Sequence, residues 1–300
     1  MQRILFITLS NIGDAVMTTP VLAALRERYP EARFDIVADA RSAALFEHFD
    51  ALGDIILKHK NVGWRDKLAF VRQLRRKRYD LIVDLRTDGL SWLLRARRRL
   101  NKIRQRAVDT HSVTQHFQAL APLLGKLPAP PTQLWIPASA HAAAAEWLSS
   151  LPGTRWLALG SGANWDGKIW DAAHFVALVN QCAGQFDGVL LLGGPADRTR
   201  AEAMRLQLKL PSVDLCGHTG LLEAAAVLAR ARVFVGNDSG LGHLASAVGT
   251  PTLTVFGPGE PLRYHPWGAQ AHWLVAPQQD LARLSVDSVA QRLNQLLEQP

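Results

Sequence analysis

Four loops of this 300-residue sequence combine polar residues with glycine directly after apolar runs, and each could carry chemistry. The first is Ser10–Asp14 (SNIGD), which follows the run 3–9. A carboxylate such as that of Asp14 can act as a general base that takes a proton from a hydroxyl group. The same aspartate can be a helix N-cap, since it satisfies free backbone N–H groups and suits the helix dipole. Both roles are compatible with the sequence.

The second loop, Gly160–Asn164 (GSGAN), follows the run 156–159 and precedes Lys168 and Trp170. A glycine-rich turn exposes backbone N–H groups to an anion, and a nearby lysine adds a positive charge. The segment is not a Walker A loop, because the Gly-Lys-Ser/Thr ending is missing. An ordinary surface turn beside an exposed lysine fits the same residues.

The third loop, Gly236–His243 (GNDSGLGH), also follows a short apolar run. The amides of Ser239 and Gly240 at a helix start can bind a phosphate, because the helix dipole favours negative charge there. His243 lies four residues after Ser239, so both face the same side of the helix. As alternatives, Asp238 and Ser239 can be plain helix caps and the histidine can be structural. The gathering of polar residues where a parallel sheet binds ligands favours a binding role.

The fourth loop, Gly193–Asp197 (GGPAD), follows the run 189–192. Gly193 and Gly194 would place it on the same edge of the sheet as the second and third loops. A tight turn is the simpler interpretation of these glycines when they are taken alone.

Basic residues exceed acidic ones by 34 to 26, which gives a net charge of +8 and a pI of about 9.9. The excess lies in residues 1–130, with 23 basic against 13 acidic residues, and includes the tract Arg95–Arg106. This tract can be a solvated surface, a nucleic-acid site or a site for phosphorylated glycolipid at a membrane. No interleaved aromatic residues or known nucleic-acid module accompany it.

The apolar runs alternate with helical patterns, which predicts parallel sheets with right-handed crossovers. The expected strands are 3–9, 34–38, 54–57, 79–85, 155–160, 188–193, 232–236 and 252–256, and the expected helices are 15–29, 41–48, 64–78, 171–184, 197–209, 220–230, 239–248 and 286–299. Four prolines in Gly125–Pro137 mark a linker between two halves of similar size. We expect an α/β protein of two Rossmann-like domains, with parallel sheets facing one another across a cleft.

The predicted domains are residues 1–136 and 137–284, followed by a helix at 285–300 that can pack back toward the first domain.

Two cysteines, Cys182 and Cys216, cannot form a disulfide framework or a four-thiolate zinc site. The longest charge-free stretches contain prolines or glycines that interrupt a spanning helix, and the first apolar run is too short for a signal peptide. We therefore expect a cytoplasmic protein.

Together these loops resemble the motifs of glycosyltransferase family 9, the lipopolysaccharide heptosyltransferases, which have the GT-B fold. Ser10–Asp14 is similar to the family's amino-terminal Gly-Asp motif. Gly162–Trp165 with Lys168–Trp170 is similar to the Lys-x-Trp segment that holds donor phosphate. Asn237–Ala245 is similar to the Asp-Ser/Thr-Gly-x-x-His-Leu donor motif, and Phe256–Pro261 to the Phe-Gly-Pro-Thr-Asp-Pro turn. The resemblance spans nearly the whole chain.

The resemblance implies transfer of heptose from ADP-L-glycero-β-D-manno-heptose to a hydroxyl of the lipopolysaccharide inner core, with inversion at the anomeric carbon. Asp14 would be the catalytic base. Lys168 and the Ser239 and Gly240 amides would stabilise the departing diphosphate, while Asp238 and His243 would orient the donor. The remaining donor-binding residues would be Asn164, Gly193, Gly194 and Thr219, with Thr219 beside the nucleotide base.

The acceptor implied is Kdo-lipid A or the growing core, which carries carboxylates and phosphates. The basic first domain would bind it through Arg95, Arg97 and Arg98, in peripheral contact with the cytoplasmic face of the inner membrane. The sequence departs from the family at Asp84–Gly89 (DLRTDG), where an Asp-x-Gln-Gly segment near the acceptor is usual. No nucleic acid, cofactor or metal is expected, since no carboxylate cluster suits magnesium.

Two alternatives remain at this point. One is a GT-B enzyme that uses another nucleotide sugar, including a sugar-nucleotide epimerase. The other is a non-enzymatic polyanion-binding protein whose basic tract is the functional surface. The first predicts stabilisation by a nucleotide sugar other than ADP-heptose, and the second predicts salt-sensitive polyanion binding with no nucleotide effect.

Overall fold

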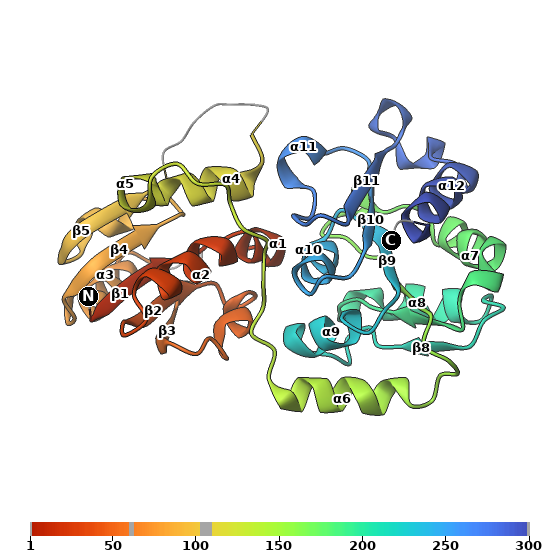
Figure 1. The fold of residues 1–300 in the computed structure, drawn as a ribbon, viewed down its shortest axis with the longest axis horizontal. Coiled ribbons are helices and arrows are strands. Elements are labelled where there is room, and N and C mark those ends of the chain that lie inside the picture. The colour runs from red at the N-terminus through yellow and green to blue at the C-terminus, as the bar shows by residue number, and fades with distance from the viewer. Residues whose placement is uncertain (1, 60–62, 103–109, 299–300) are drawn as a thin grey trace. The chain divides into compact units, whose positions relative to one another are not determined.

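The computed structural model describes residues 2–59, 63–102 and 110–298, and Figure 1 shows its elements. The chain divides into two compact units, Met1–Trp135 and Ile136–Pro300, here called the first and second units. The division falls within the proline-rich stretch predicted as a linker. None of the helices in the described ranges has the length and apolar run needed to cross a membrane.

The first unit is a five-stranded parallel sheet with the order β3-β2-β1-β4-β5. Its strands are β1 (Arg3–Ile7), β2 (Arg33–Ala38), β3 (Leu52–Leu57), β4 (Tyr79–Asp84) and β5 (Ala96–Asn101). Its helices are α1 (Ile12–Val16), α2 (Thr19–Arg28), α3 (Trp64–Arg75), α4 (Ser112–Phe117) and α5 (Ala121–Leu124), with short 3₁₀ helices η1 (Ala43–Phe46), η2 (Leu90–Leu93) and η3 (Gln118–Leu120). The residues Ile4 to Ile7 of β1 have no solvent exposure, as expected for an apolar run covered on both faces.

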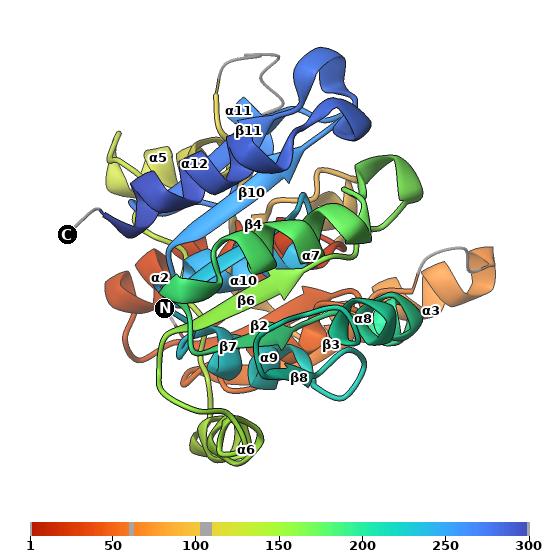
Figure 2. The same ribbon diagram turned by 90° about the vertical axis from the view of Figure 1, so that its right-hand side faces the viewer.

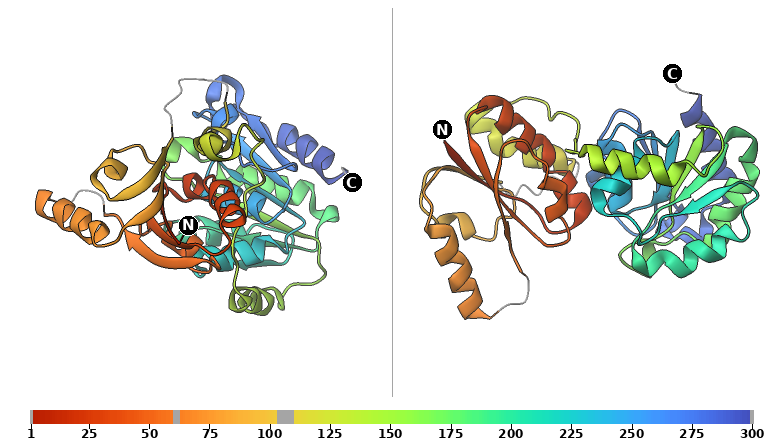
Figure 3. Two further views of the ribbon diagram at one scale, coloured as in Figure 1. Left: turned by 60° about the vertical axis from the view of Figure 1, so that its left-hand side comes forward. Right: turned by 90° about the horizontal axis from the view of Figure 1, so that it is seen from below.

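The helices of the first unit lie on both faces of its sheet. One face carries α1, α2 and α4, and the other carries α3 and η2, which share a core with β1, β2, β3 and β4 (Figure 3). The chain runs from β1 outward to β3 and then returns to β4 and β5 on the other side of β1. The pair β1 and β4 is therefore the switch point of the sheet, where open α/β sheets bind ligands beyond the carboxyl ends of their strands.

The second unit is a six-stranded parallel sheet with the order β11-β10-β9-β6-β7-β8. Its strands are β6 (Trp156–Gly160), β7 (Gly188–Leu191), β8 (Ser212–Asp214), β9 (Val233–Asn237), β10 (Thr252–Phe256) and β11 (Ala271–Val275). Its helices are α6 (Ala138–Leu148), α7 (Ala172–Gln181), α8 (Arg198–Arg205), α9 (Leu221–Leu228), α10 (Gly240–Ala247), α11 (Pro261–Tyr264) and α12 (Val286–Leu297), with 3₁₀ helices η4 (Asp166–Lys168), η5 (Ala183–Gln185), η6 (Pro195–Asp197), η7 (Pro277–Gln279) and η8 (Leu281–Arg283).

One face of the second sheet is covered by α7, α8 and α12, as Figure 2 shows, and the other carries α9 and α10. The terminal helix α12 packs against α7 and buries Val289, Leu293 and Leu296 in the core of the second unit. The chain runs from β6 outward to β8 and returns to β9, so β6 and β9 form the switch point of this sheet.

Two predicted helices of the first unit differ from the structure. The helix expected at 15–29 is broken into α1 and α2, because Thr18 Oγ1 donates to the carbonyl of Ala15 (2.7 Å) and Pro20 has no N–H for a continuous helix. The helix expected at 41–48 is only the short η1.

The basic tract Arg95–Arg106 is also different. The sequence analysis predicted no strand in this tract, but Ala96–Asn101 form the edge strand β5, which pairs with β4. Residues 103–106 lie outside the described residues. The strands β8 and β11, which the sequence analysis did not predict, form the two edges of the second sheet.

Candidate functional site

The predicted donor loops meet at the switch point of the second unit. β6 pairs with β9 in parallel, so the loop after Gly160 and the loop after Asn237 leave the same edge of the sheet side by side. Gly160–Asn164 and Asp238–His243 are thus neighbours in space although some 70 residues of chain separate them. This is the position at which open α/β sheets hold a ligand.

Asn237, the last residue of β9, ties these loops together. It has no solvent exposure; its Nδ2 donates to the carbonyl of Ser161 (2.7 Å), and its Oδ1 accepts from the backbone N–H of Trp170 (3.0 Å). An amide is the side chain that offers one donor and one acceptor at this size. The sequence analysis gave Asn237 no role of its own. The available signal was a polar residue at the end of an otherwise apolar strand.

Replacing Asn237 by alanine is expected to lower the free energy of unfolding by about 3 kcal/mol, because two buried backbone groups lose their partners. The affinity for a ligand held by these loops should fall as well, since both loops would shift. Asn180→Ala is the matched control: Asn180 also bridges a backbone carbonyl (Gln207) and a backbone N–H (Lys209), but at the surface. Urea denaturation of the two variants checks the difference, and equal losses would contradict the role given to Asn237.

Lys168 and Asp238 form an ion pair at the mouth of this site. Lys168 Nζ lies 2.5 Å from Asp238 Oδ2, and the two side chains are 22% and 13% exposed. Lys168 ends η4, which is followed by the fully buried Trp170, whose indole Nε1 donates to the carbonyl of Leu284 (3.0 Å). The lysine thus projects from a firmly anchored segment. The ammonium is already neutralised, so an anionic ligand must compete with the carboxylate for it.

Two polar atoms at the start of α10 are buried and have no hydrogen-bond partner among the described residues: Ser239 Oγ and His243 Nδ1. Ser239 occupies the N-cap position of α10, but its side chain makes no capping bond. The capping alternative for Ser239 is therefore not realised. Buried polar groups in native proteins are nearly always bonded, so two orphans beside the Lys168–Asp238 pair suit a polar ligand.

His243 is neutral at physiological pH. Burial lowers the pKa of His243 to about 4, and the positive charges of His265 and Lys168 act in the same direction. The ring can therefore offer one N–H and one bare nitrogen to a ligand, rather than a charge.

Lowering the pH from 7 to 4 is expected to reduce the free energy of unfolding by about 3 kcal/mol more in the wild type than in a His243→Gln variant. The unfolded chain takes up a proton at His243 near its usual pKa, whereas the folded chain resists it down to about pH 4. Stability is therefore lost as the pH falls through this window. Denaturation curves at several pH values test the difference, and identical slopes would contradict a buried neutral histidine.

The loop after β7 adds Gly193 and Gly194 to the same edge. A Cβ at Gly193 would lie 2.8 Å from Cβ of Asp197, and one at Gly162 would overlap the Asp197 carboxylate, so both glycines permit close packing. The N–H of Gly194 donates to Asp197 Oδ2 (2.9 Å). The backbone amide of Gly194 is thus already used within its own turn.

The remaining predicted donor residues lie on exposed or half-buried loops. Asn164 is exposed in the loop after β6. Thr219 is half-buried in the loop after β8, where Arg198 donates to the carbonyls of Cys216 (3.1 Å) and Gly217 (2.8 Å). The structure gathers Lys168, Asp238, Ser239 and His243 and places Thr219 two strands away from β6.

Asp14 lies at the switch point of the first unit, just beyond the carboxyl end of β1. The helix α1 begins at Ile12, and Asn11 is its N-cap, so Asp14 is inside the first turn and is not the cap residue. Asn11 Nδ2 donates to Asp14 Oδ2 (2.9 Å) and holds one carboxylate oxygen in place. The Asp14 residue is half-buried.

Basic side chains follow the carboxyl ends of the strands around Asp14. They are Arg41 after β2, Lys58 after β3, Arg86 after β4 and Lys102 after β5. Arg86 Nη2 donates to Ser10 Oγ (2.5 Å), which fixes its guanidinium beside the loop that bears Asp14. Lys58 pairs with Asp88, and Arg41 with Asp39. The sequence analysis gave these residues no role, although Arg41, Lys58 and Arg86 each stand within three residues of the end of a predicted strand.

The predicted acceptor residues Arg95, Arg97 and Arg98 are not brought near Asp14. The register pairs Ala96 with Tyr79, the first residue of β4, so these arginines lie toward the amino end of β5, whereas Asp14 lies beyond the carboxyl ends. Arg97 pairs with Asp80 (3.5 Å), and Arg98 donates to the carbonyl of Pro122 (2.7 Å). The reason is that the tract is a strand, so its residues are spread along the sheet instead of being gathered in one loop.

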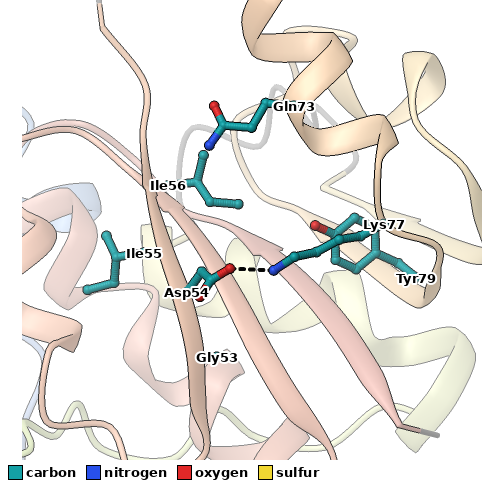
Figure 4. A pocket seen from close by; sticks show the side chains of 7 residues that line it. All are labelled: Gly53, Asp54, Ile55, Ile56, Gln73, Lys77 and Tyr79. Atoms are coloured by element: carbon teal, nitrogen blue, oxygen red, sulfur yellow. Dashed lines mark hydrogen bonds and ion pairs between the residues drawn. The ribbon is translucent and has the colours of Figure 1, made fainter.

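A separate pocket of about 330 Å³ lies at the edge of the first sheet (Figure 4). It is lined by Asp54 and its neighbours on β3 and by Lys77 and Tyr79 after α3. Lys77 Nζ bonds to Asp54 (2.5 Å) and to the buried Asp35 (2.8 Å). Burial and the nearby Asp35 raise the pKa of Tyr79, whose hydroxyl donates to that carboxylate (3.2 Å). These groups are mutually satisfied and hold the end of α3 on the sheet.

Two parallel α/β units, each with polar loops at its switch point, are the architecture of the GT-B fold. The family model of glycosyltransferase family 9 (heptosyltransferase) matches residues 67–293. This range is most of the chain, so the protein belongs to that family and is a glycosyltransferase. The matched range contains all the predicted donor-binding residues, while Asp14 precedes it.

Curated relatives and solved structures agree with this assignment. A lipopolysaccharide heptosyltransferase 3 of Escherichia coli is 28% identical over 284 residues, which cover 85% of this chain and 83% of the relative. A lipopolysaccharide heptosyltransferase 1 of Pseudomonas aeruginosa is 29% identical over 296 residues, covering 87% and 80%. The fold matches E. coli heptosyltransferase WaaC with ADP (TM-score 0.79, 23% identity, covering 98% and 100%). It also matches WaaC with ADP-2-deoxy-2-fluoro heptose (TM-score 0.76, 23% identity, covering 98% and 99%).

Proposed function

We propose that the protein transfers heptose from ADP-L-glycero-β-D-manno-heptose to a hydroxyl group of the lipopolysaccharide inner core, with inversion at the anomeric carbon. The observation that carries the donor assignment is the cluster at β6 and β9, where Lys168, Asp238 and two unpartnered buried polar atoms meet. Relatives named lipopolysaccharide heptosyltransferases, and a similar fold holding an ADP-heptose analogue, support the choice of substrates.

On the donor side, the diphosphate would take the place of the Asp238 carboxylate at Lys168. Ser239 is the N-cap residue of α10 and Gly240 is its first residue, so their backbone amides lie at the start of the helix. The helix dipole stabilises added negative charge there. Negative charge grows on the diphosphate as the bond to the anomeric carbon breaks, so these groups act most strongly in the transition state. The released Asp238 and the neutral His243 are then available to hydrogen-bond the sugar. Asn164, Gly193, Gly194 and Thr219 complete the proposed donor site.

On the acceptor side, Asp14 would accept the proton of the attacking hydroxyl group. The oxygen forms its bond to the anomeric carbon on the face opposite to the departing ADP, which gives inversion. The bond from Asn11 to Oδ2 orients the carboxylate of Asp14, which would receive the proton. No other group is required to move a proton in this step.

The anionic groups of the acceptor would meet the basic side chains at the carboxyl ends of the first sheet. We place Arg41, Lys58 and Arg86 there, and we give Arg95, Arg97 and Arg98 only a contribution to the positive field of the unit. Kdo-lipid A or a growing core, presented at the cytoplasmic face of the inner membrane, has the carboxylates and phosphates that this arrangement fits. Action there would require only peripheral contact with the membrane.

The test is a mass-spectrometric assay of ADP-heptose with defined inner-core acceptors, alongside a thermal-shift panel of ADP-, UDP- and GDP-sugars. The proposal expects stabilisation by ADP-heptose and a product heavier by one heptose. Stabilisation by a UDP- or GDP-sugar alone would instead indicate another donor or an epimerase. Salt-sensitive polyanion binding without any nucleotide effect would indicate a non-enzymatic protein.

A further inference from the structure

The face of the first unit formed by α3 and η2 exposes several large apolar side chains. They are Leu57 at the end of β3 (41% exposed), Trp64 (70%) and Leu68 (40%) on α3, and Trp92 (70%) and Leu93 (56%) on η2. We call these five residues the α3–η2 surface. Leu74 of α3 and Leu90 of η2 belong to one core cluster, so both elements lie on the same side of the sheet. Clustering of exposed apolar residues on one face marks an interaction site.

The helix α3 is attached by one end only. Leu74 is its only buried residue, and the first turns, from Trp64 to Ala69, are exposed throughout. Lys77, just after the helix, pairs with Asp54, as Figure 4 shows, and also with the buried Asp35. These bonds hold the carboxyl end of α3 on the sheet. The amino-terminal half extends away from the sheet (Figure 3). A helix of a globular protein normally turns its apolar stripe to the core, whereas Trp64 and Leu68, one turn apart, face outward here.

The charge around this apolar stripe is strongly positive. Residues 64–78 contain seven basic residues and one acidic residue, Asp66, which gives +6. On the helix, Arg65, Lys67 and Arg72 flank the stripe formed by Trp64 and Leu68. Long basic side chains can keep their charge in water while their stems lie along an apolar surface. This combination of exposed tryptophan, leucine and flanking cations is that of a helix lying in a membrane interface.

We propose that the α3–η2 surface docks the protein on the anionic surface of a phospholipid bilayer. Trp64 and Leu68 enter the boundary between headgroups and acyl chains, and the cations of α3 contact lipid phosphates. Charge complementarity favours an anionic surface, and the exposed apolar pair favours a lipid bilayer, whose acyl-chain boundary can bury both Trp64 and Leu68. The inference rests on the proposed function in one respect: an acceptor anchored in a membrane gives such docking a purpose.

Flotation with vesicles tests the proposal. The wild-type protein should bind vesicles of phosphatidylcholine with about one-third phosphatidylglycerol, and bind vesicles of phosphatidylcholine alone at least about tenfold more weakly. The double variant Trp64→Ser/Leu68→Ser should lose about tenfold or more in binding to the anionic vesicles. Leu206→Ser, which removes a 75%-exposed leucine from the second unit, is the matched control and should bind as the wild type does.

Several results would overturn the proposal. Binding of the double variant equal to that of the wild type, or equal binding to neutral and anionic vesicles, would each do so. Self-association that the double variant abolishes, with no vesicle binding, would assign the surface to a second copy of the chain. Heptose transfer to a deacylated acceptor in free solution keeps the two proposals apart. Heptose transfer in that assay without vesicle binding would contradict only the proposed docking surface. Vesicle binding without heptose transfer would contradict only the proposed reaction.

Discussion

Replacing Asp14 by asparagine is expected to lower kcat by about a thousandfold while the affinity for ADP-heptose stays within about twofold. Asparagine has nearly the same shape and can still accept the bond from the Asn11 side chain, so the loop after β1 keeps its conformation. It cannot accept a proton from the acceptor hydroxyl. The loss should therefore fall on turnover and leave donor binding, which we propose for the second unit, unaffected.

Steady-state kinetics and calorimetric titration of ADP-heptose check the two halves of this expectation. The matched control is Asp50→Asn, which removes a carboxylate from the surface ion pair with Arg26 in the same unit and should keep wild-type kcat. Asp14→Glu should recover part of the lost activity, since a carboxylate returns at a displaced position. If Asp14→Asn turned over at the wild-type rate, the carboxylate would have no role as a base.

The elements that the sequence predicted best are those whose pattern is local. The strand β10 was expected at 252–256 and occupies those residues, because a short run of β-branched and apolar residues ends there at a glycine and proline turn. The loops after β1, β6 and β9 were found for the same reason: each begins where apolar residues give way to polar ones. These loops lie at the switch points of their sheets, so a correct topology was enough to place them on the ligand-binding edges.

What the sequence could not predict depends on contacts between distant residues. The strand β5 contains three arginines in six residues and has no apolar alternation; it is a strand because the backbone of β4 pairs with it. Arg86 was visible as a departure from the family pattern, but its bond to Ser10 spans 76 residues and could not be inferred from either segment. The roles of Asn237 and of the Lys168–Asp238 pair were hidden in the same way.

The Lys168–Asp238 pair leads to the second large effect. Lys168→Met is expected to weaken ADP binding by about thirtyfold and to lower kcat by about a hundredfold, because a charged hydrogen bond to the departing diphosphate is lost. Methionine keeps most of the side-chain length, so the packing of the segment before Trp170 should be preserved. Calorimetric titration of ADP and steady-state kinetics measure the two effects.

Asp238→Asn should not weaken ADP binding as Lys168→Met does, although both variants should lower turnover. In the structure the Asp238 carboxylate pairs with the ammonium that we propose for the diphosphate, and its negative charge would repel that ligand. Asparagine removes both obstacles, so ADP should bind as tightly as in the wild type or up to about tenfold more tightly. Turnover should nevertheless fall, because the carboxylate released by the donor is the group proposed to orient its sugar.

The different effects of the two variants on ADP affinity show whether the diphosphate replaces Asp238 as the partner of Lys168 or the ion pair is purely structural. A structural pair would lose ADP affinity and stability together in both variants, since breaking either half leaves a partly buried charge alone. The matched control is Glu202→Gln, which removes a carboxylate from the exposed pair with Arg205 in the same unit and should change neither quantity. If Asp238→Asn weakened ADP binding as much as Lys168→Met, the diphosphate would not be taking the place of the carboxylate, and the leaving-group role of Lys168 would need a different geometry.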